Sequence, residues 1–145
     1  MTPDAAMKVA LGAARRVAGR TYPNPPVGAV IFRGDHVLGR GATRPVGGPH
    51  AEIVALESAK RRFGVKSLRG ASLVVTLEPC CRTGRTGPCT AAILEAGIRR
   101  VFVGHRDPHP DVSGAGVRRL RRAGVEVQLG VLEEACRVQH RGFSR

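Results

Sequence analysis

The sequence predicts an α/β fold in which helices cover both faces of a central five-stranded mixed sheet. An initial β-hairpin is followed by strand-like and helix-like segments in alternation, which is the pattern of such layered sheets. The chain has 145 residues, a length that suits one domain and suffices to bury about two-thirds of the unfolded surface. We therefore expect a single domain over residues 1–145.

The N-terminal part of the chain predicts a helix and then the hairpin. Residues 5–17 carry apolar side chains at helical spacing, and Gly19 with the proline-rich segment after it ends this helix. Residues 27–32 and 37–41 are β-rich runs on either side of residues 33–35, a sequence typical of a hairpin turn. These two runs should form the first two strands.

Strands and helices then alternate to residue 138. A helical stretch begins at His50, and residues 71–77 form a β-branched run typical of a buried strand, which leads into a cysteine-containing loop. The remaining segments follow the same two patterns. The expected helices are 50–63, 89–97, 114–123 and 132–138, and the expected later strands are 71–77, 100–104 and 125–129.

The formal net charge of +13 favours an anionic partner, either a nucleic acid or a phosphorylated small molecule. Much of the excess lies in Arg118, Arg119, Arg121 and Arg122, which helical spacing places on a solvated face opposite apolar positions. Aromatic residues make up only 3% of the chain, so a stacking surface for single strands is poorly supplied. No apolar run has the about 20 residues of a membrane span, and the N-terminus does not read as a secretory signal, so we expect a cytoplasmic protein.

Two short motifs carry the chemistry: His50-Ala51-Glu52 at a helix start, and Pro79-Cys80 followed, after eight intervening residues, by Cys89 at another helix start. Imidazole and thiolates are ligands that zinc prefers, and three protein ligands leave the fourth tetrahedral position open for water, as in catalytic sites. Helix N-termini help to keep the sulfurs ionised. We therefore predict that His50, Cys80 and Cys89 bind a zinc ion.

Glu52 is the predicted proton carrier of this site. It lies two residues after His50, so it need not bind the metal but can reach a bound water molecule. Moving a proton from water to a leaving nitrogen is the acid and base work of hydrolytic deamination, and this combination of motifs is the known signature of zinc deaminases. Of the other thiols, we expect Cys136 to be a reduced core residue and assign no role to Cys81.

Over nearly its whole length the chain resembles the deaminase domain of the bifunctional riboflavin-biosynthesis deaminase/reductase. The matching stretches are residues 19–21, 23–25, 27–30, 49–52, 76–80, 84–86, 88–89, 107–108 and 110–116. The eight-residue gap between the cysteines also fits that family, whereas tRNA and cytidine deaminases usually have a two-residue gap. The resemblance implies a three-layer cytidine deaminase-like fold without a reductase domain.

The resemblance also implies the site. Zinc would be held by His50, Cys80 and Cys89, with Glu52 as proton shuttle. Substrate contacts would come from four residues: Asn24, Arg85, Thr86 and Asp107. The substrate would be a diaminopyrimidinone ribosylamino 5′-phosphate derived from GTP, and a homo-oligomer, either a dimer or a tetramer, is expected by analogy with other proteins of the fold.

The chain departs from the family pattern around the pocket. Thr43 and Arg82 stand where histidines are usual, His109 stands for an asparagine, and Ala115 for a basic residue. One hypothesis is therefore a diverged paralogue that acts on a related GTP-derived pyrimidine in a specialised-metabolite pathway. Two alternatives remain open: a nucleic-acid base deaminase, because of the charge, and a binding module with a structural zinc.

Overall fold

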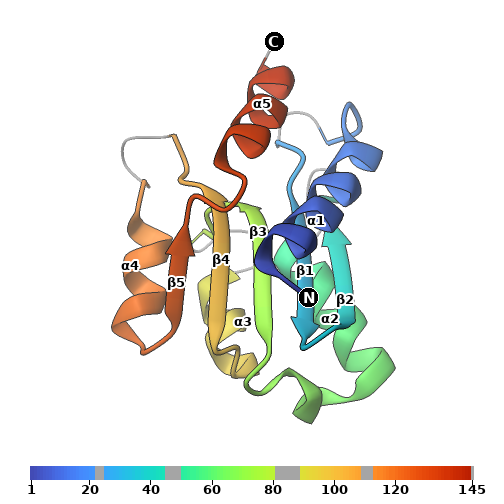
Figure 1. Cartoon of the computed structure of the whole chain (residues 1–145), viewed down its shortest axis with the longest axis vertical. Coiled ribbons are helices and arrows are strands. Elements are labelled where there is room, and N and C mark those ends of the chain that lie inside the picture. Colours follow the sequence, from blue (N-terminus) through green and yellow to red (C-terminus); the bar gives the residue numbers. More distant parts are fainter. Residues whose placement is uncertain (22–24, 45–49, 81–88, 109–112, 145) are drawn as a thin grey trace.

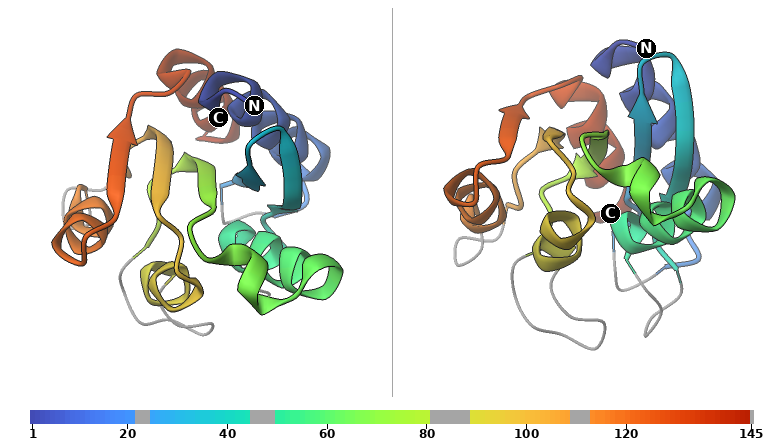
Figure 2. Two further views of the ribbon diagram at one scale, coloured as in Figure 1. Left: turned by 60° about the horizontal axis from the view of Figure 1, so that its bottom comes forward. Right: turned by 90° about the horizontal axis from the view of Figure 1, so that it is seen from below.

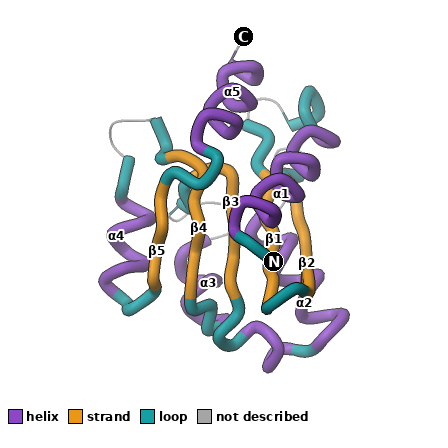
Figure 3. Tube along the Cα trace, viewed as in Figure 1, coloured by secondary structure: helices purple, strands orange, loops and turns teal. Residues whose placement is uncertain are grey.

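The computed structural model describes residues 1–21, 25–44, 50–80, 89–108 and 113–144. The fold follows the predicted alternation of strands and helices (Figures 1 and 3). In chain order the elements are α1 (Pro3–Val17), β1 (Gly28–Arg33), β2 (His36–Ala42), α2 (Ala51–Phe63), the short 3₁₀ helix η1 (Val65–Leu68), β3 (Ser72–Leu77), α3 (Cys89–Ala96), β4 (Arg100–His105), α4 (Ala115–Arg122), β5 (Glu126–Leu129) and α5 (Glu133–Ser144).

The strands form one mixed sheet of five, as predicted, in the order β2-β1-β3-β4-β5. The hairpin strand β1 is antiparallel to both of its neighbours, whereas β3, β4 and β5 run parallel to one another. Parallel strands need crossover helices between them, and α3 and α4 fill this role. The carboxyl ends of β3 and β4 therefore lie side by side at one edge, where ligands of open α/β sheets usually bind.

Helices cover both faces of the sheet, so the three-layer prediction is confirmed (Figure 2). Helices α1 and α5 lie on one face, and α2, α3 and α4 lie on the other. In β1 the side chains of Ala29 and Ile31 belong to the core beneath α2 and α3, while Val30 and Phe32 belong to the core beneath α1. This alternation follows from the two-residue period of a strand, and burial of both faces explains the continuous apolar run.

Helix α2 lies directly against β2, and this contact positions the candidate site. A Cβ atom added at Gly41 would overlap the main-chain carbonyl oxygen of Ala51, the first residue of α2. Only glycine permits so close an approach of strand and helix. The start of α2, with His50 before it, is thereby held over the sheet.

The last helix is longer than predicted, because α5 reaches Ser144 whereas its apolar spacing suggested an end at Val138. Val138 itself is 52% exposed, so apolar spacing was a poor guide to this helix. Tertiary contacts continue it instead. Gln139 donates to the main-chain oxygen of Leu11 in α1 at 3.1 Å, and the ring of His140 contacts that of His105.

The surface arginines of α4 are arranged as predicted. Val117 and Leu120 are buried against the sheet, and the four arginines of this helix are exposed. None of the helices in the described ranges combines the length and apolarity that crossing a membrane would take.

Candidate metal centre and catalytic pocket

Three side chains from three elements meet at the edge of the sheet. His50 is the N-cap residue of α2, Cys80 follows the end of β3, and Cys89 is the first residue of α3. Their ligand atoms all lie within 4.8 Å of one another. The Nδ1 atom of His50 lies 3.1 Å from the Sγ atom of Cys89 and 3.5 Å from that of Cys80. The structure thus brings together the three residues predicted as metal ligands.

The donor set itself fits a dipositive cation. A side-chain hydrogen bond with Cys89 lowers the pKa of the Cys80 thiol to about 4, and a hydrogen bond with His50 also lowers this pKa. The same interaction with Cys80, together with burial, raises the pKa of Cys89. Without a cation, the two neighbouring thiols favour a single thiolate and disfavour a second. A bound zinc ion would stabilise both thiolates. One imidazole and two thiolates are a typical ligand set for catalytic zinc.

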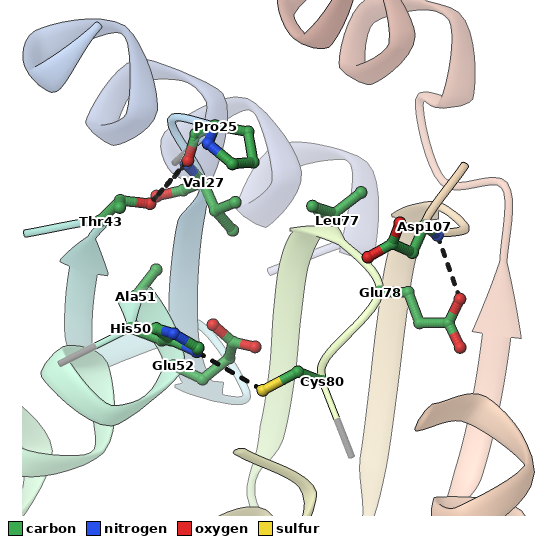
Figure 4. Close-up of a pocket in the computed structure, with 10 residues that line it drawn as sticks. All are labelled: Pro25, Val27, Thr43, His50, Ala51, Glu52, Leu77, Glu78, Cys80 and Asp107. Carbon is green, nitrogen blue, oxygen red and sulfur yellow. Dashed lines mark hydrogen bonds between the residues drawn. The ribbon is translucent and has the colours of Figure 1, made fainter. Parts of the chain in front are cut away.

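Glu52 lies beside this cluster in the first turn of α2. Its side chain is only 4% exposed, and burial raises the pKa of its carboxyl group to about 7. In Figure 4 its carboxylate lies next to the imidazole of His50 and on the side of the cavity that Cys80 also faces. A carboxyl group with a pKa near neutrality can both accept and return a proton, as a proton shuttle must.

The cluster opens into a cavity of about 170 Å³. Apolar cavities of about 150 Å³ hold a benzene molecule, so this space suffices for one six-membered ring. The lining residues are Pro25, Val27, Thr43, His50, Ala51, Glu52, Leu77, Glu78, Cys80 and Asp107 (Figure 4).

The other residues predicted for the site divide into two groups. Asp107 lines the cavity from the segment that follows β4. Three further predicted substrate contacts, Asn24, Arg85 and Thr86, lie outside the described residues, and so do Cys81, Arg82 and His109. The substrate-binding roles of Asn24, Arg85, Thr86 and Asp107 therefore remain predictions.

Thr43 and Ala115, two departures from the family pattern, lie at different places. Thr43 lines the cavity, but its hydroxyl group accepts a hydrogen bond from the amide of Val27 at 2.8 Å and lies 3.2 Å from the carbonyl oxygen of Pro25. These contacts of Thr43 hold the segment that precedes β1 in place. Ala115 is the first residue of α4 and does not line this cavity.

Glu78 lines the cavity but is not among the site residues predicted from the sequence. It is 5% exposed, and its carboxylate accepts hydrogen bonds from the backbone amides of Asp107, Gly114 and Val117. The available signal was a charged residue at the end of a buried strand, directly before Pro79-Cys80. Such a residue is rarely buried without partners.

Cys136 is the core thiol that we expected. It is 2% exposed, lies against Gly104, and burial raises the pKa of its thiol to about 11. It belongs to the core beneath α1, on the opposite face of the sheet from α2 and α3.

Comparison with known proteins agrees with this site. The family described as the cytidine and deoxycytidylate deaminase zinc-binding region matches residues 1–105. The chain therefore belongs to this zinc-binding deaminase family. Its cluster of one histidine and two cysteines is a set that could hold the metal of the family.

Within that family the chain is similar to riboflavin-biosynthesis proteins. It is 49% identical over 137 residues to the riboflavin biosynthesis protein RibD of Synechocystis, covering 94% of this chain and 36% of that protein. It is also 49% identical to RibD of Aquifex aeolicus, covering 94% of this chain and 37% of that protein. The chain thus spans about a third of the length of these relatives.

A solved structure agrees in fold and sequence. The crystal structure of a diaminohydroxyphosphoribosylaminopyrimidine deaminase/5-amino-6-(5-phosphoribosylamino)uracil reductase from Thermotoga maritima superposes with a TM-score of 0.90 at 46% identity. The match covers 98% of this chain and 40% of that chain. The predicted resemblance to the riboflavin-pathway deaminases is therefore confirmed at the level of family and fold.

Proposed function

We propose that this domain is a zinc-dependent hydrolase that deaminates a diaminopyrimidinone ribosylamino 5′-phosphate. The observation that carries the proposal is the meeting of His50, Cys80 and Cys89 beside the buried carboxyl group of Glu52, in a cavity of about 170 Å³. Similarity to the Thermotoga maritima protein, whose name includes this deaminase, supports the choice of substrate over other aminopyrimidines. The formal net charge of +13 is compatible with a phosphorylated substrate.

The proposed mechanism assigns each described residue a task. A zinc ion held by His50, Cys80 and Cys89 would supply hydroxide near neutral pH by lowering the pKa of water. Glu52 takes up the proton of that water and passes it to the amino group that leaves as ammonia. In the metal-free chain, burial raises the pKa of this carboxyl group to about 7, and this tendency to hold a proton favours uptake of the proton from water.

The remaining residues would orient the ring and the ribose phosphate. We propose that the carboxylate of Asp107, which lines the cavity opposite α2, accepts a hydrogen bond from a ribose hydroxyl group. By resemblance to the family, Asn24 would contact the ring, and Arg85 and Thr86 would contact the phosphate side. Walls formed by Val27 and Leu77 would limit access of bulk water to the ring.

The decisive experiment is a measurement of ammonia release by the zinc-loaded protein. The substrates are the diaminopyrimidinone ribosylamino 5′-phosphate, its dephosphorylated form, a related GTP-derived pyrimidine, cytidine, and a single-stranded RNA. We expect rapid release from the first only. Rapid release from the RNA would instead favour a nucleic-acid deaminase. Slow turnover of the ribosylamino 5′-phosphate, together with rapid turnover of the related GTP-derived pyrimidine, would favour the diverged paralogue.

We further propose that the protein works in the cytoplasm and self-associates. The cysteines at positions 80, 89 and 136 are free thiols, which supports a reducing compartment. A homo-oligomer is proposed by analogy with proteins of this fold alone. Light scattering of the purified protein during size-exclusion chromatography would give the mass directly, and a mass of one chain would contradict the second proposal.

A further inference from the structure

Glu78 is a buried carboxylate that points away from the metal cluster. Its Oε1 atom accepts hydrogen bonds from the amide of Asp107 at 3.1 Å and from the amide of Gly114 at 2.9 Å. Its Oε2 atom accepts one from the amide of Val117 at 3.2 Å. Figure 4 shows the side chain directed towards the segment after β4, whereas Cys80, two residues later, faces His50.

A carboxylate suits this position for a physical reason. Gly114 is the N-cap residue of α4 and has no side chain to cap the helix, so the first amides of α4 would otherwise lack partners. The N-terminus of a helix also carries partial positive charge, which stabilises an anion there. Charge-assisted bonds from three amides offset the cost of burying Glu78.

Glu78 also joins the metal side of the pocket to the substrate side. The backbone amide of Glu78 donates to the carbonyl oxygen of His105 at 3.0 Å, so this residue holds the end of β4 through its backbone and its side chain. Next to it, Gly116 lies so close to the carbonyl oxygen of Pro79 that an added Cβ atom would overlap it. Asp107 lies in the chain between His105 and Gly116, and it lines the cavity itself.

Cys80 has separate support from another element. Its carbonyl oxygen accepts a hydrogen bond from the amide of Thr90 in α3 at 3.2 Å, and its sulfur atom faces His50. The segment that follows β3 therefore contributes to both sides of the cavity. Cys80 lies on the metal side, and Glu78 lies on the substrate side. Loss of the Glu78 carboxylate should disturb Asp107 before it disturbs the cluster of His50, Cys80 and Cys89.

We propose that Glu78 is a positioning residue that sets the place of Asp107 in the pocket and thereby the binding of the substrate's ribose. This inference rests on the proposed function, because it assigns Asp107 to the substrate. Glu78 acts through the amide of Asp107 and does not touch the reacting atoms. The competing view is that Glu78 only stabilises the start of α4, in which case it contributes to folding and not to KM.

The test is a double-mutant cycle of Glu78→Gln and Asp107→Asn in the zinc-loaded protein. In Glu78→Gln an amide NH₂ group replaces one of the accepting oxygens and faces an amide donor. A misplaced contact should raise KM by about tenfold to a hundredfold, with kcat and zinc content nearly unchanged. Because Glu78 acts through Asp107, the double variant should be no worse than Asp107→Asn alone.

Leu68→Val supplies the control for general destabilisation. Leu68 is buried in η1 before the start of β3, at the end of that strand away from the pocket, so this variant should lose stability without a change in KM. If Glu78→Gln does not fold, Glu78→Asp, which keeps the charge but shortens its reach, takes its place in the cycle. Additive effects on KM, an unchanged KM, or a loss of zinc in proportion to activity would each overturn the inference.

Amide hydrogen exchange separates this inference from the proposed function. Glu78→Gln should speed exchange at the amide of Asp107, whatever the substrate proves to be. A wild-type protein that releases no ammonia from the ribosylamino 5′-phosphate would contradict the proposed function. Unchanged exchange at Asp107 in the variant would overturn the positioning role, with or without turnover.

Discussion

The two buried glutamates, Glu52 and Glu78, lie on opposite walls of one cavity and have different partners. Glu52 is 4% exposed and stands beside the cluster of His50, Cys80 and Cys89, and burial raises the pKa of its carboxyl group to about 7. Glu78 is 5% exposed and accepts hydrogen bonds from three backbone amides of the opposite wall. Equal burial therefore does not mean equal function: Glu52 lies beside the predicted metal ligands, and Glu78 accepts hydrogen bonds that hold the opposite wall.

Replacing Glu52 should remove most of the turnover. Glu52→Gln keeps the shape of the side chain but cannot carry the proton, so kcat should fall by about 10²- to 10⁴-fold. Zinc content, measured by atomic absorption, should stay equal to that of the wild type, because Glu52 is not a predicted ligand. Glu57→Gln, an exposed glutamate of the same helix, is the matched control and should leave kcat unchanged.

That experiment also tests the alternative of a structural zinc. A Glu52→Gln variant with kcat within about threefold of the wild type would contradict the proposed mechanism. A variant that has lost its zinc would instead place Glu52 among the residues that maintain the metal site. Retained zinc with lost turnover excludes a purely structural role of the metal.

The stability of the metal-free protein should depend on pH through the raised pKa of Glu52. The pKa of Glu52 is raised from 4.5 to about 7, so between these values the folded chain binds a proton that the unfolded chain has released. The contribution of Glu52 to the free energy of unfolding should therefore fall as pH rises through this window, by up to roughly 3 kcal/mol, whereas the lowered pKa of Cys80 contributes in the opposite direction. Urea denaturation at a series of pH values measures this slope.

Glu52→Gln is the control for the pH experiment, since it removes this titrating group and keeps the opposing contribution of Cys80, so the difference between the two curves isolates Glu52. Wild type and variant should then differ most above neutral pH, where the variant is the more stable. Parallel curves for the two proteins would show that another group governs the dependence.

The wall of the cavity beside Glu78 depends on the close approach of Gly116 to Pro79. Gly116→Ala places a Cβ atom against the carbonyl oxygen of Pro79, so α4 must shift away from the Glu78 carboxylate. Overpacking of this kind costs about 1–3 kcal/mol of the free energy of unfolding. Thermal and urea denaturation measure the loss, and a variant as stable as the wild type would mean that α4 moves freely against β3.

Replacing Gly12, which lies outside both walls of the cavity, should change the free energy of unfolding only slightly. Gly12 lies within α1 and a Cβ atom added there would meet no atom within 4 Å. Gly12→Ala should therefore raise the free energy of unfolding by about 0.5–1 kcal/mol, because alanine loses less backbone entropy in a helix. Paired with Gly116→Ala, this variant separates the general effect of a glycine replacement from the specific contact with Pro79. A loss of stability at position 12 would contradict the helical geometry of this site.

Local patterns in the sequence were enough to predict the element order and the metal cluster. The spacing of His50 and Glu52 at a helix start, and of Cys80 and Cys89 between a strand and a helix, needs only neighbouring residues to be read. The same holds for the apolar face of α4, where Val117 and Leu120 are buried as the helical period requires. Short-range periodicity and motif spacing carry this information because the forces behind them act within one or two turns.

Long-range contacts decided the rest, and no local pattern records them. Glu78 finds its amide donors 29 to 39 residues further along the chain, where β4 and α4 return to the end of β3. The extent of α5 depends on its contact with Leu11 near the other end of the chain. A buried carboxylate or a polar helix end is stable only with its partner in place, and the tertiary fold alone supplies that partner.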